Sequence, residues 1–409
     1  MAFASWQSTA EFGRLGSCGT NLVGISARND VSTIAGVAEA ADKGLLEAFP
    51  AGNNVVMLAD NGSVDGTVER FAATRLQAEK LTVCSDSAGN GKGTNILALA
   101  GRALQLGARQ LVIMGGNLCN PKPEWIRLLA SAVSCNRPAI ALPAYVCGRY
   151  EASITNQLMR PLIAAVFGAH LAQPIGGEFA FNHALLQQMS AWEATDSVRL
   201  HGIDVWLTAN ALRAGLRVAE VPLGRKEDNW NPVKSLSRTQ QLLDALFHVM
   251  TWLDKPRPVA RTAAAHRQVV DEAVPRGSPP QYTPALRACL SRYVARHRED
   301  LCRLFPSARN LQCAPWGMRV PAETWPELLA DAVEGLAAGE FLRSRDHLIA
   351  LLVSRTATFW EEVQDLEAHR IDSLLARQVR DTAAAVRRRN IAFRGSFPAS
   401  FSSGLWEGL

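Results

Sequence analysis

The chain has 409 residues, of which 48% are hydrophobic, and this length favours two domains over a single core. The formal net charge is only +5 and the basic residues are spread along the chain, which argues against a nucleic-acid-binding protein. Eight cysteines without a CxxC pair indicate reduced thiols and a cytoplasmic location. No apolar stretch reaches the roughly 18 residues of a membrane span, and the N-terminus lacks the pattern of a secretory signal, so no membrane partner is expected.

In chain order, short apolar runs alternate with segments of helical periodicity. The predicted strands are 22–25, 55–58, 81–83 and 111–114. The helices that follow them are expected from about residue 33, from about residue 68, at 96–104 and at 125–132. Repeated strand–helix units predict an α/β fold with a doubly wound, mostly parallel sheet. Ligands bind such sheets at the carboxyl ends of the strands.

Prolines interrupt a polar stretch after Leu253, and the pattern beyond it is helical. The predicted domains are an α/β domain at 1–255, a proline-rich linker at 256–285 and a helical C-terminal domain at 286–409. An apolar stripe from Leu348 to Leu366 fits a homodimer interface and fits packing within one chain equally well.

Five motifs follow one another along the first domain, and the one with the most specific pattern is Gln-Pro-Ile-Gly-Gly-Glu at 173–178. Together they resemble the motifs of GT-A type glycosyltransferases, and within these the mannosylglycerate synthase and glucosyl-3-phosphoglycerate synthase families. The resemblance covers residues 22 to about 236. It implies a GT-A fold and a retaining enzyme that moves a sugar from a nucleoside diphosphate, GDP favoured and UDP the alternative, to a small polar acceptor bearing a carboxylate. The five motifs are Ser26–Asp30, Asp60–Thr67, Asn90–Gly93, Gln173–Glu178 and His201–Asp204.

The donor site is expected around the Gly-Lys-Gly segment at 91–93, where glycines let the backbone approach a diphosphate and Lys92 supplies positive charge. Asp60 is expected to contact the base or ribose, or alternatively to cap the turn after its strand. Asp30, at the same sheet edge, is expected to contact the nucleotide or alternatively to cap the next helix. The resemblance implies a donor site of Ala27, Arg28, Asp30, Asp60, Gly62, Lys92, Gly93, Gly115, Gly116, Asn117 and Lys226.

The acceptor is expected at Gly176, Gly177 and Glu178, which offer backbone N–H groups and a carboxylate unless they form a plain turn. Asp204 and Glu178 are the catalytic candidates. Asp204 would stabilise or orient an oxocarbenium-like transition state, and its alternative is an ordinary acid at a helix start.

The resemblance adds Arg149 and Thr155 to the acceptor site. Ser153 stands where phosphoglycerate-using members of these families have an arginine, which argues against a phosphorylated acceptor.

The chain departs from the resemblance where a metal would bind, because Gly115, Gly116 and Asn117 replace the Asp-x-Asp motif. Asp228 takes the place of a later metal-binding histidine. Asn117 and Asp228 remain as candidate ligands for Mg²⁺ or Mn²⁺, but such sites normally carry more negative charge. We therefore hypothesise that metal is dispensable and that Lys92, with Arg28, Arg225 or Lys226, offsets the charge of the leaving diphosphate. Activity that EDTA abolishes and Mg²⁺ or Mn²⁺ restores would reject this hypothesis.

Several acceptors fit the resemblance. Glycosylation of a thiol such as that of ergothioneine, in lincosamide antibiotic biosynthesis, is one candidate, and compatible-solute synthesis from glycerate is another. Nothing in the residues selects between them. The lost Asp-x-Asp motif also leaves a non-catalytic nucleotide-binding pseudoglycosyltransferase as the alternative. A sugar nucleotidyltransferase is disfavoured because its glycine-rich N-terminal phosphate loop is missing.

Overall fold

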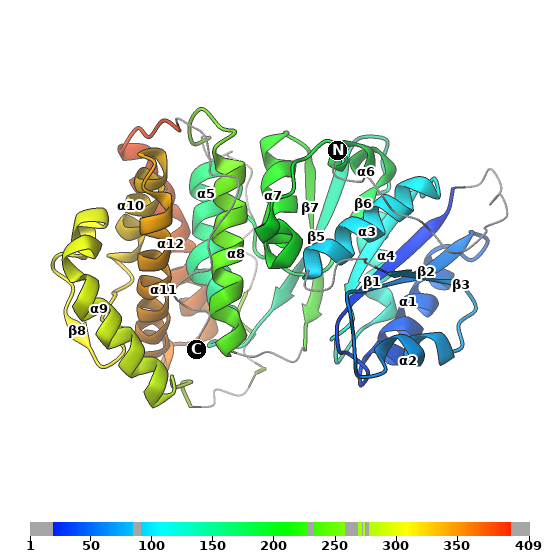
Figure 1. The fold of residues 1–409 in the computed structure, drawn as a ribbon, viewed down its shortest axis with the longest axis horizontal. Helices are drawn as coiled ribbons and strands as arrows, with labels where there is room; N and C mark the ends of the chain where they lie inside the picture. Colours follow the sequence, from blue (N-terminus) through cyan, green and yellow to red (C-terminus); the bar gives the residue numbers. More distant parts are fainter. Residues whose placement is uncertain are drawn as a thin grey trace. The chain divides into compact units, whose positions relative to one another are not determined.

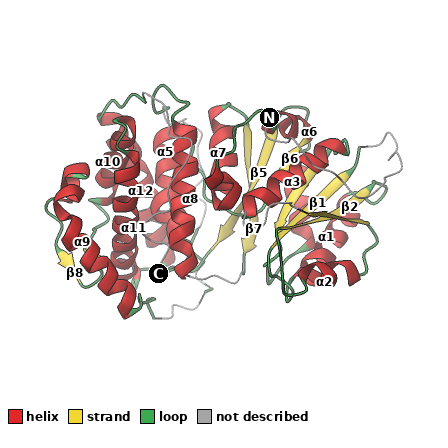
Figure 2. Cartoon of the chain, in the orientation of Figure 1, coloured by secondary structure: helices red, strands yellow, loops and turns green. Residues whose placement is uncertain are grey.

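The computed structural model describes residues 19–84, 91–227, 232–257, 269–271, 273–274 and 278–393. The chain forms two compact units, and each is built from two stretches of sequence. The first unit, Met1–Tyr145 with Ile175–Asn231, carries the large sheet, and the second, Val146–Pro174 with Pro232–Leu409, is mainly helical (Figures 1 and 2). Among the described helices, none combines the length and the apolar character needed to span a membrane.

Seven strands form one mixed sheet in the order β3-β2-β1-β4-β6-β5-β7. Strands β3, β2, β1 and β4 run parallel, and β6 lies antiparallel between β4 and β5. This confirms the predicted α/β class and all four predicted strands, each of which extends beyond its apolar run. The strands are β1 Asn21–Ala27, β2 Asn54–Asp60, β3 Glu79–Cys84, β4 Gln110–Gly115, β5 Ala139–Val146, β6 Phe179–Asn182 and β7 Arg217–Arg225.

Helices cover both faces of this sheet. On one face, Trp125 and Ile126 of α4 share a core with Val23 and Ile25 of β1 and with residues of α1. On the other face α3 packs so closely that a Cβ at Gly24 of β1 would come 2.9 Å from Leu99 Cδ1. Since helices cover both faces, ligands reach this sheet at the ends of its strands. The helices of this unit are α1 Ile34–Ala48, α2 Thr67–Ala73, α3 Lys92–Gln105, α4 Pro123–Ala132, α6 His183–Met189, the π-helix η2 Val198–Gly202 and α7 Ile203–Arg213.

The second unit confirms the predicted helical character of the C-terminal region. Phe359 and Val363 of α11 pack against Ile371 and Leu375 of α12, so packing within the chain accounts for this end of the apolar stripe. The elements of this unit are η1 Ile154–Met159, α5 Arg160–Phe167, α8 Pro232–Met250, α9 Pro284–Leu304, η3 Pro306–Ala308, β8 Cys313–Ala314, β9 Gly317–Met318, α10 Trp325–Ala337, α11 Phe341–Val363 and α12 Ala368–Arg388.

The compact units divide the chain elsewhere than at the expected limits of 255 and 286. Helix α5, from the first half of the sequence, packs against α12 and belongs to the helical unit, as does α8. The described residues between 256 and 283 contain no helix or extended strand, and Val270 forms an isolated bridge with Cys147. Prolines therefore mark where regular structure stops, whereas compactness depends on which distant segments pack together.

Candidate functional site

Polar side chains tie the loop after β1 to the loop after β2. Asn29 N donates a hydrogen bond to Ser63 Oγ at 2.7 Å, and Asp30 N donates to Thr67 Oγ1 at 2.8 Å. Residues of two predicted motifs thus hold neighbouring loops in place at the carboxyl edge of the sheet. Some residues of these motifs therefore have a structural role, because they hold the loops that surround the site.

Asp65 joins the same loops, since Val31 N donates to its Oδ2 (3.1 Å) and Thr67 N and Oγ1 donate to its Oδ1 (3.1 and 2.5 Å). The hydrogen bond from the Thr67 side chain is the main cause that lowers the pKa of Asp65. Because the folded-state pKa is lowered, the carboxylate stabilises the fold above its unfolded-state pKa, and this contribution is lost as the pH falls through the folded-state pKa.

We therefore expect Asp65→Asn to lower the free energy of unfolding at neutral pH, and we expect its difference from the parent protein to shrink below about pH 4. Urea unfolding at a series of pH values measures this difference. Asp196→Asn, at an exposed position, is the matched control. A difference for Asp65→Asn that stays constant down to acidic pH would contradict the assignment.

Asp60 caps the turn after β2. Its Oδ2 accepts hydrogen bonds from Gly62 N and Ser63 N, both at 2.9 Å, and its Oδ1 accepts one from Ser63 Oγ. Gly62 has φ +91°, a conformation that favours glycine. The structure thus shows the capping role that was the alternative for Asp60, and its contact with a base or ribose stays a prediction.

The loops after β1 and β4 meet at Gly116. Asp30 Oδ2 accepts a hydrogen bond from Arg28 N at 3.0 Å, and a Cβ at Gly116 would come 2.7 Å from that oxygen and 2.8 Å from Ala27 Cβ. The main-chain oxygen of Asp30 accepts from Ile34 N (2.9 Å) at the start of α1, so this contact of Asp30 with the helix is a main-chain one. Four of the predicted donor-site residues therefore lie together.

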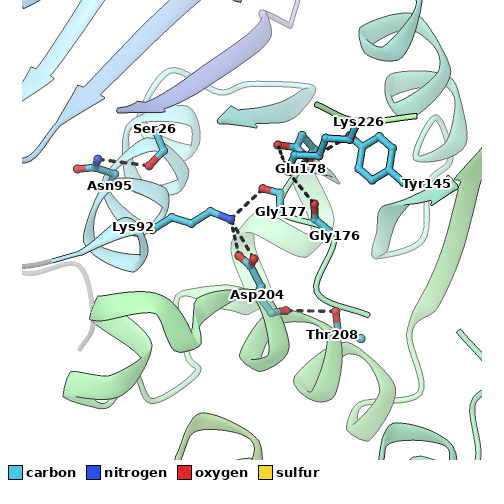
Figure 3. A network of polar contacts seen from close by, with 10 residues as sticks. All are labelled: Ser26, Lys92, Asn95, Tyr145, Gly176, Gly177, Glu178, Asp204, Thr208 and Lys226. Carbon is cyan, nitrogen blue, oxygen red and sulfur yellow. Dashed lines mark hydrogen bonds and ion pairs between the residues drawn. The ribbon is translucent and has the colours of Figure 1, made fainter. Parts of the chain in front are cut away.

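Lys92 and Asp204, from two distant motifs, form an ion pair (Figure 3). Lys92 is the first residue of α3 and Asp204 lies in the first turn of α7. The Lys92 Nζ atom lies 2.8 and 2.9 Å from the two carboxylate oxygens and 3.1 Å from Gly177 O. The side chains keep 24% and 13% of their surface exposed, so solvent and ligands can reach the pair.

The glycines beside Lys92 allow another segment of the chain to approach closely. A Cβ at Gly93 would come 1.8 Å from Val198 O, and one at Gly91 would come 2.7 Å from Leu200 Cα. These glycines allow α3 to begin directly against η2, which accounts for them without a bound diphosphate. Asn90 of the same motif lies outside the described residues.

Lys226 and Glu178 form a second ion pair next to the first (Figure 3). The Lys226 Nζ atom lies 3.2 and 3.1 Å from the Glu178 oxygens and 3.3 Å from Gly176 O. Tyr145 OH, on β5, donates to Glu178 Oε2 at 3.0 Å. Glu178 is only 1% exposed, whereas Lys226 keeps 18% of its side-chain surface exposed.

Tyr145 is a residue that the sequence analysis missed. The available signal was a hydroxyl group near the end of an apolar run, because a buried tyrosine normally finds a hydrogen-bond partner.

Arg149 and Thr155 belong to the second unit. Arg149 Nη1 donates to the main-chain oxygens of Val363, Gln364 and Leu366 at 2.9, 3.0 and 3.0 Å, where α11 ends. Basic side chains commonly satisfy the last carbonyls of a helix in this way. Thr155 is buried in η1. Contact of these two residues with an acceptor stays a prediction.

Of the two expected metal ligands, only Asn117 lies in the part of the chain that the structure describes. Within it, no group of three or more His, Cys, Asp or Glu side chains could hold a metal ion. Asn117 lies beside Gly115, and Asp228 falls outside the described residues.

No protein-family model matches the chain, and no curated protein matches it either. Among solved structures, the chain is similar in part to glucosyl-3-phosphoglycerate synthase from Mycobacterium tuberculosis. For the complex with Mg²⁺ and UDP, the identity is 20%, the match covers 57% of this chain and 80% of the other, and the TM-score is 0.46. For a complex with Mn²⁺, UDP-glucose and phosphoglyceric acid, these values are 20%, 60%, 88% and 0.47. Similarity of this extent describes a partly shared chain path and assigns no activity.

Proposed function

We propose that the protein is a glycosyltransferase that moves a sugar from a nucleoside diphosphate to a small polar acceptor. The observation that carries this proposal is the convergence of two ammonium groups and two carboxylates around Gly177, from segments that lie far apart in the sequence. Glu178 directly precedes β6, whose pairing with β4 brings it to the carboxyl end of that strand. Ligands of α/β sheets bind at this edge.

The four charged groups suit the two halves of a nucleotide sugar. Ammonium groups donate short, charge-assisted hydrogen bonds to phosphate oxygens, and carboxylates accept hydrogen bonds from sugar hydroxyls. In the reaction, an acceptor heteroatom bonds to the anomeric carbon while the bond from that carbon to the diphosphate oxygen breaks, and the proton of the acceptor passes to the leaving diphosphate. Lys92 would offset the negative charge that develops on the leaving oxygen, and Asp204 would face the positive charge that develops on the sugar.

Glu178 has a different part in this proposal. Both of its oxygens contact Lys226, one also accepts from Tyr145, and the side chain is almost fully buried. We infer that Glu178 acts by positioning Lys226 and the loop at Gly177.

The proposed carrier is GDP, with UDP as the alternative, and the proposed acceptor bears a carboxylate. Ser153, in place of an arginine, favours an acceptor without a phosphate. Glycerate and a thiol zwitterion such as ergothioneine both belong to this class, in compatible-solute and antibiotic biosynthesis respectively.

The second candidate is a non-catalytic nucleotide-binding protein, which the missing carboxylates at Gly115 to Asn117 favour. One experiment separates the two. Purified protein is screened by thermal unfolding with GDP, UDP and ADP, and is then incubated with GDP- and UDP-hexoses and each candidate acceptor, with product detection by mass spectrometry.

We expect one nucleoside diphosphate, at 100 times its dissociation constant, to stabilise the protein by about 2.7 kcal/mol. We also expect a glycosylated acceptor that appears only with the matching donor. Binding without any product over the donor and acceptor panel would support the non-catalytic candidate. Absence of binding to every nucleotide would contradict both candidates.

A further inference from the structure

Among the described residues, the segment that replaces the Asp-x-Asp motif does not fit a divalent metal. Gly115 and Gly116 have no side chains, and Asn117 offers a single neutral oxygen, whereas Mg²⁺ and Mn²⁺ sites use anionic oxygens. A side chain at Gly115 would begin 3.0 Å from Asn117 Oδ1 and 3.3 Å from Glu178 Oε1, so neighbouring oxygens occupy the space that a carboxylate arm would need.

A cation of the protein itself lies next to this place. Lys226 Nζ contacts Glu178 Oε1, the same oxygen that borders Gly115, at 3.2 Å. A carboxylate and the Gly176 carbonyl hold the ammonium, and these are the oxygen types that also hold hard metal ions. Tyr145 OH donates a hydrogen bond to the same carboxylate, and the centre of the Tyr145 ring lies 5.7 Å from the ammonium. These contacts fix the position of the Lys226 ammonium.

Lys92 supplies a second ammonium close by. A Cβ at Gly177 would come 3.1 Å from Lys226 Nζ and 3.4 Å from Lys92 Nζ, so both ammonium groups lie close to the same point beside this residue. Both lysines remain partly exposed. Two fixed cations that both border Gly177 suit the charge of a diphosphate, because a lysine ammonium is a compact positive charge with rotatable donors.

We propose that the ammonium of Lys226, anchored by Glu178 and Tyr145, takes the place of a divalent metal and binds the diphosphate of the donor together with Lys92. This inference rests on the proposed function and names the residue that makes the site independent of metal. The competing explanation is that the Lys226–Glu178 pair only holds the loop at Gly177 in place.

The test measures GDP and UDP binding by calorimetry, with EDTA and with Mn²⁺, for the parent protein and for Lys226→Gln, Lys226→Arg and Lys43→Gln. The last is the matched control, since Lys43 is exposed on α1. The parent protein should bind the diphosphate equally well in EDTA and in Mn²⁺, and more weakly as the salt concentration rises. Lys226→Gln should lower this affinity about tenfold to a hundredfold, because a charged hydrogen bond is lost.

The nucleoside monophosphate serves as a second ligand that separates a phosphate contact from a structural role. The preference for diphosphate over monophosphate should fall in Lys226→Gln and be partly restored in Lys226→Arg, which keeps the charge. Thermal unfolding confirms that each variant is folded.

If Lys226→Gln lowers the affinity for the diphosphate and for the monophosphate equally, the inference is overturned. It is also overturned if EDTA abolishes diphosphate binding by the parent protein and Mn²⁺ restores it. In the second case the proposed function stands. If the parent protein binds neither GDP nor UDP even with Mn²⁺ present, the proposed function itself fails.

Discussion

Replacement of Asp204 with asparagine is expected to lower the turnover of glycosyl transfer by roughly a hundredfold to a thousandfold, a loss typical of one preorganised electrostatic contact. The amide keeps the shape of the side chain and removes its negative charge. In the parent protein both carboxylate oxygens lie within 2.9 Å of Lys92 Nζ, and the side chain keeps 13% of its surface exposed. In the proposed reaction this carboxylate faces the sugar carbon whose bond to the diphosphate breaks.

The same replacement should leave nucleoside diphosphate binding unchanged or make it tighter. Asp204 competes with phosphate oxygens for the Lys92 ammonium, so removal of its charge frees that ammonium for the ligand. A fall in turnover with retained or increased diphosphate affinity is therefore the expected combination. Steady-state kinetics of product formation and calorimetry with the free diphosphate measure the two quantities separately.

Asp196→Asn is the matched control, because it makes the same chemical change at an exposed position outside the proposed site. Thermal unfolding of both variants shows whether either loses structure. Asp204 also lies in the first turn of α7, where an acid stabilises the helix. If Asp204→Asn loses activity only in proportion to its loss of folded protein, that structural role is sufficient and the catalytic assignment is wrong.

The parallel half of the fold was predictable because three of its four strands, β1, β2 and β4, are apolar runs buried on both faces. Val55 to Leu58 have no exposed surface, and such runs separated by helical periodicity indicate strand–helix units. Strand β6, Phe179–Asn182, was not predicted, because four residues carry too little pattern. The discontinuous units were also missed, since the packing of α5 against α12 joins segments about 200 residues apart in the sequence.

The residues of the candidate site could be predicted from the sequence, but the contacts between them could not. Lys92, Glu178 and Asp204 were identified because each lies in a motif of the resemblance, and the fold brings together the strand and helix ends that carry these motifs. Which lysine pairs with which carboxylate depends on the conformation at Gly177, which no local pattern encodes. For Asp60, hydrogen bonds to its own turn could be formed locally, and this is why its capping role was open from the sequence.

Gly177→Ala is expected to damage both ion pairs at once, because Gly177 lies between them. Its φ of +95° is strained for any residue with a Cβ, which should cost about 1–2 kcal/mol in the free energy of unfolding. The added methyl group would also begin 3.1 Å from Lys226 Nζ and 3.4 Å from Lys92 Nζ, closer than ordinary contact for the first. At least one ammonium must then move.

A displacement of about 1 Å in a binding group can lower a rate by about a hundredfold. The shift needed here is a few tenths of an ångström, so we expect a smaller fall in turnover, together with a fall in diphosphate affinity. Gly215→Ala measures the effect of backbone strain alone. Gly215 has φ +68° and a Cβ there would meet no atom within 4 Å, so the substitution should destabilise the fold and leave transfer intact. Chemical unfolding and steady-state kinetics of the two variants provide the comparison. Equal losses of activity would show that strain alone acts at Gly177, whereas a loss confined to Gly177→Ala ties the reaction to the positions of the two ammonium groups.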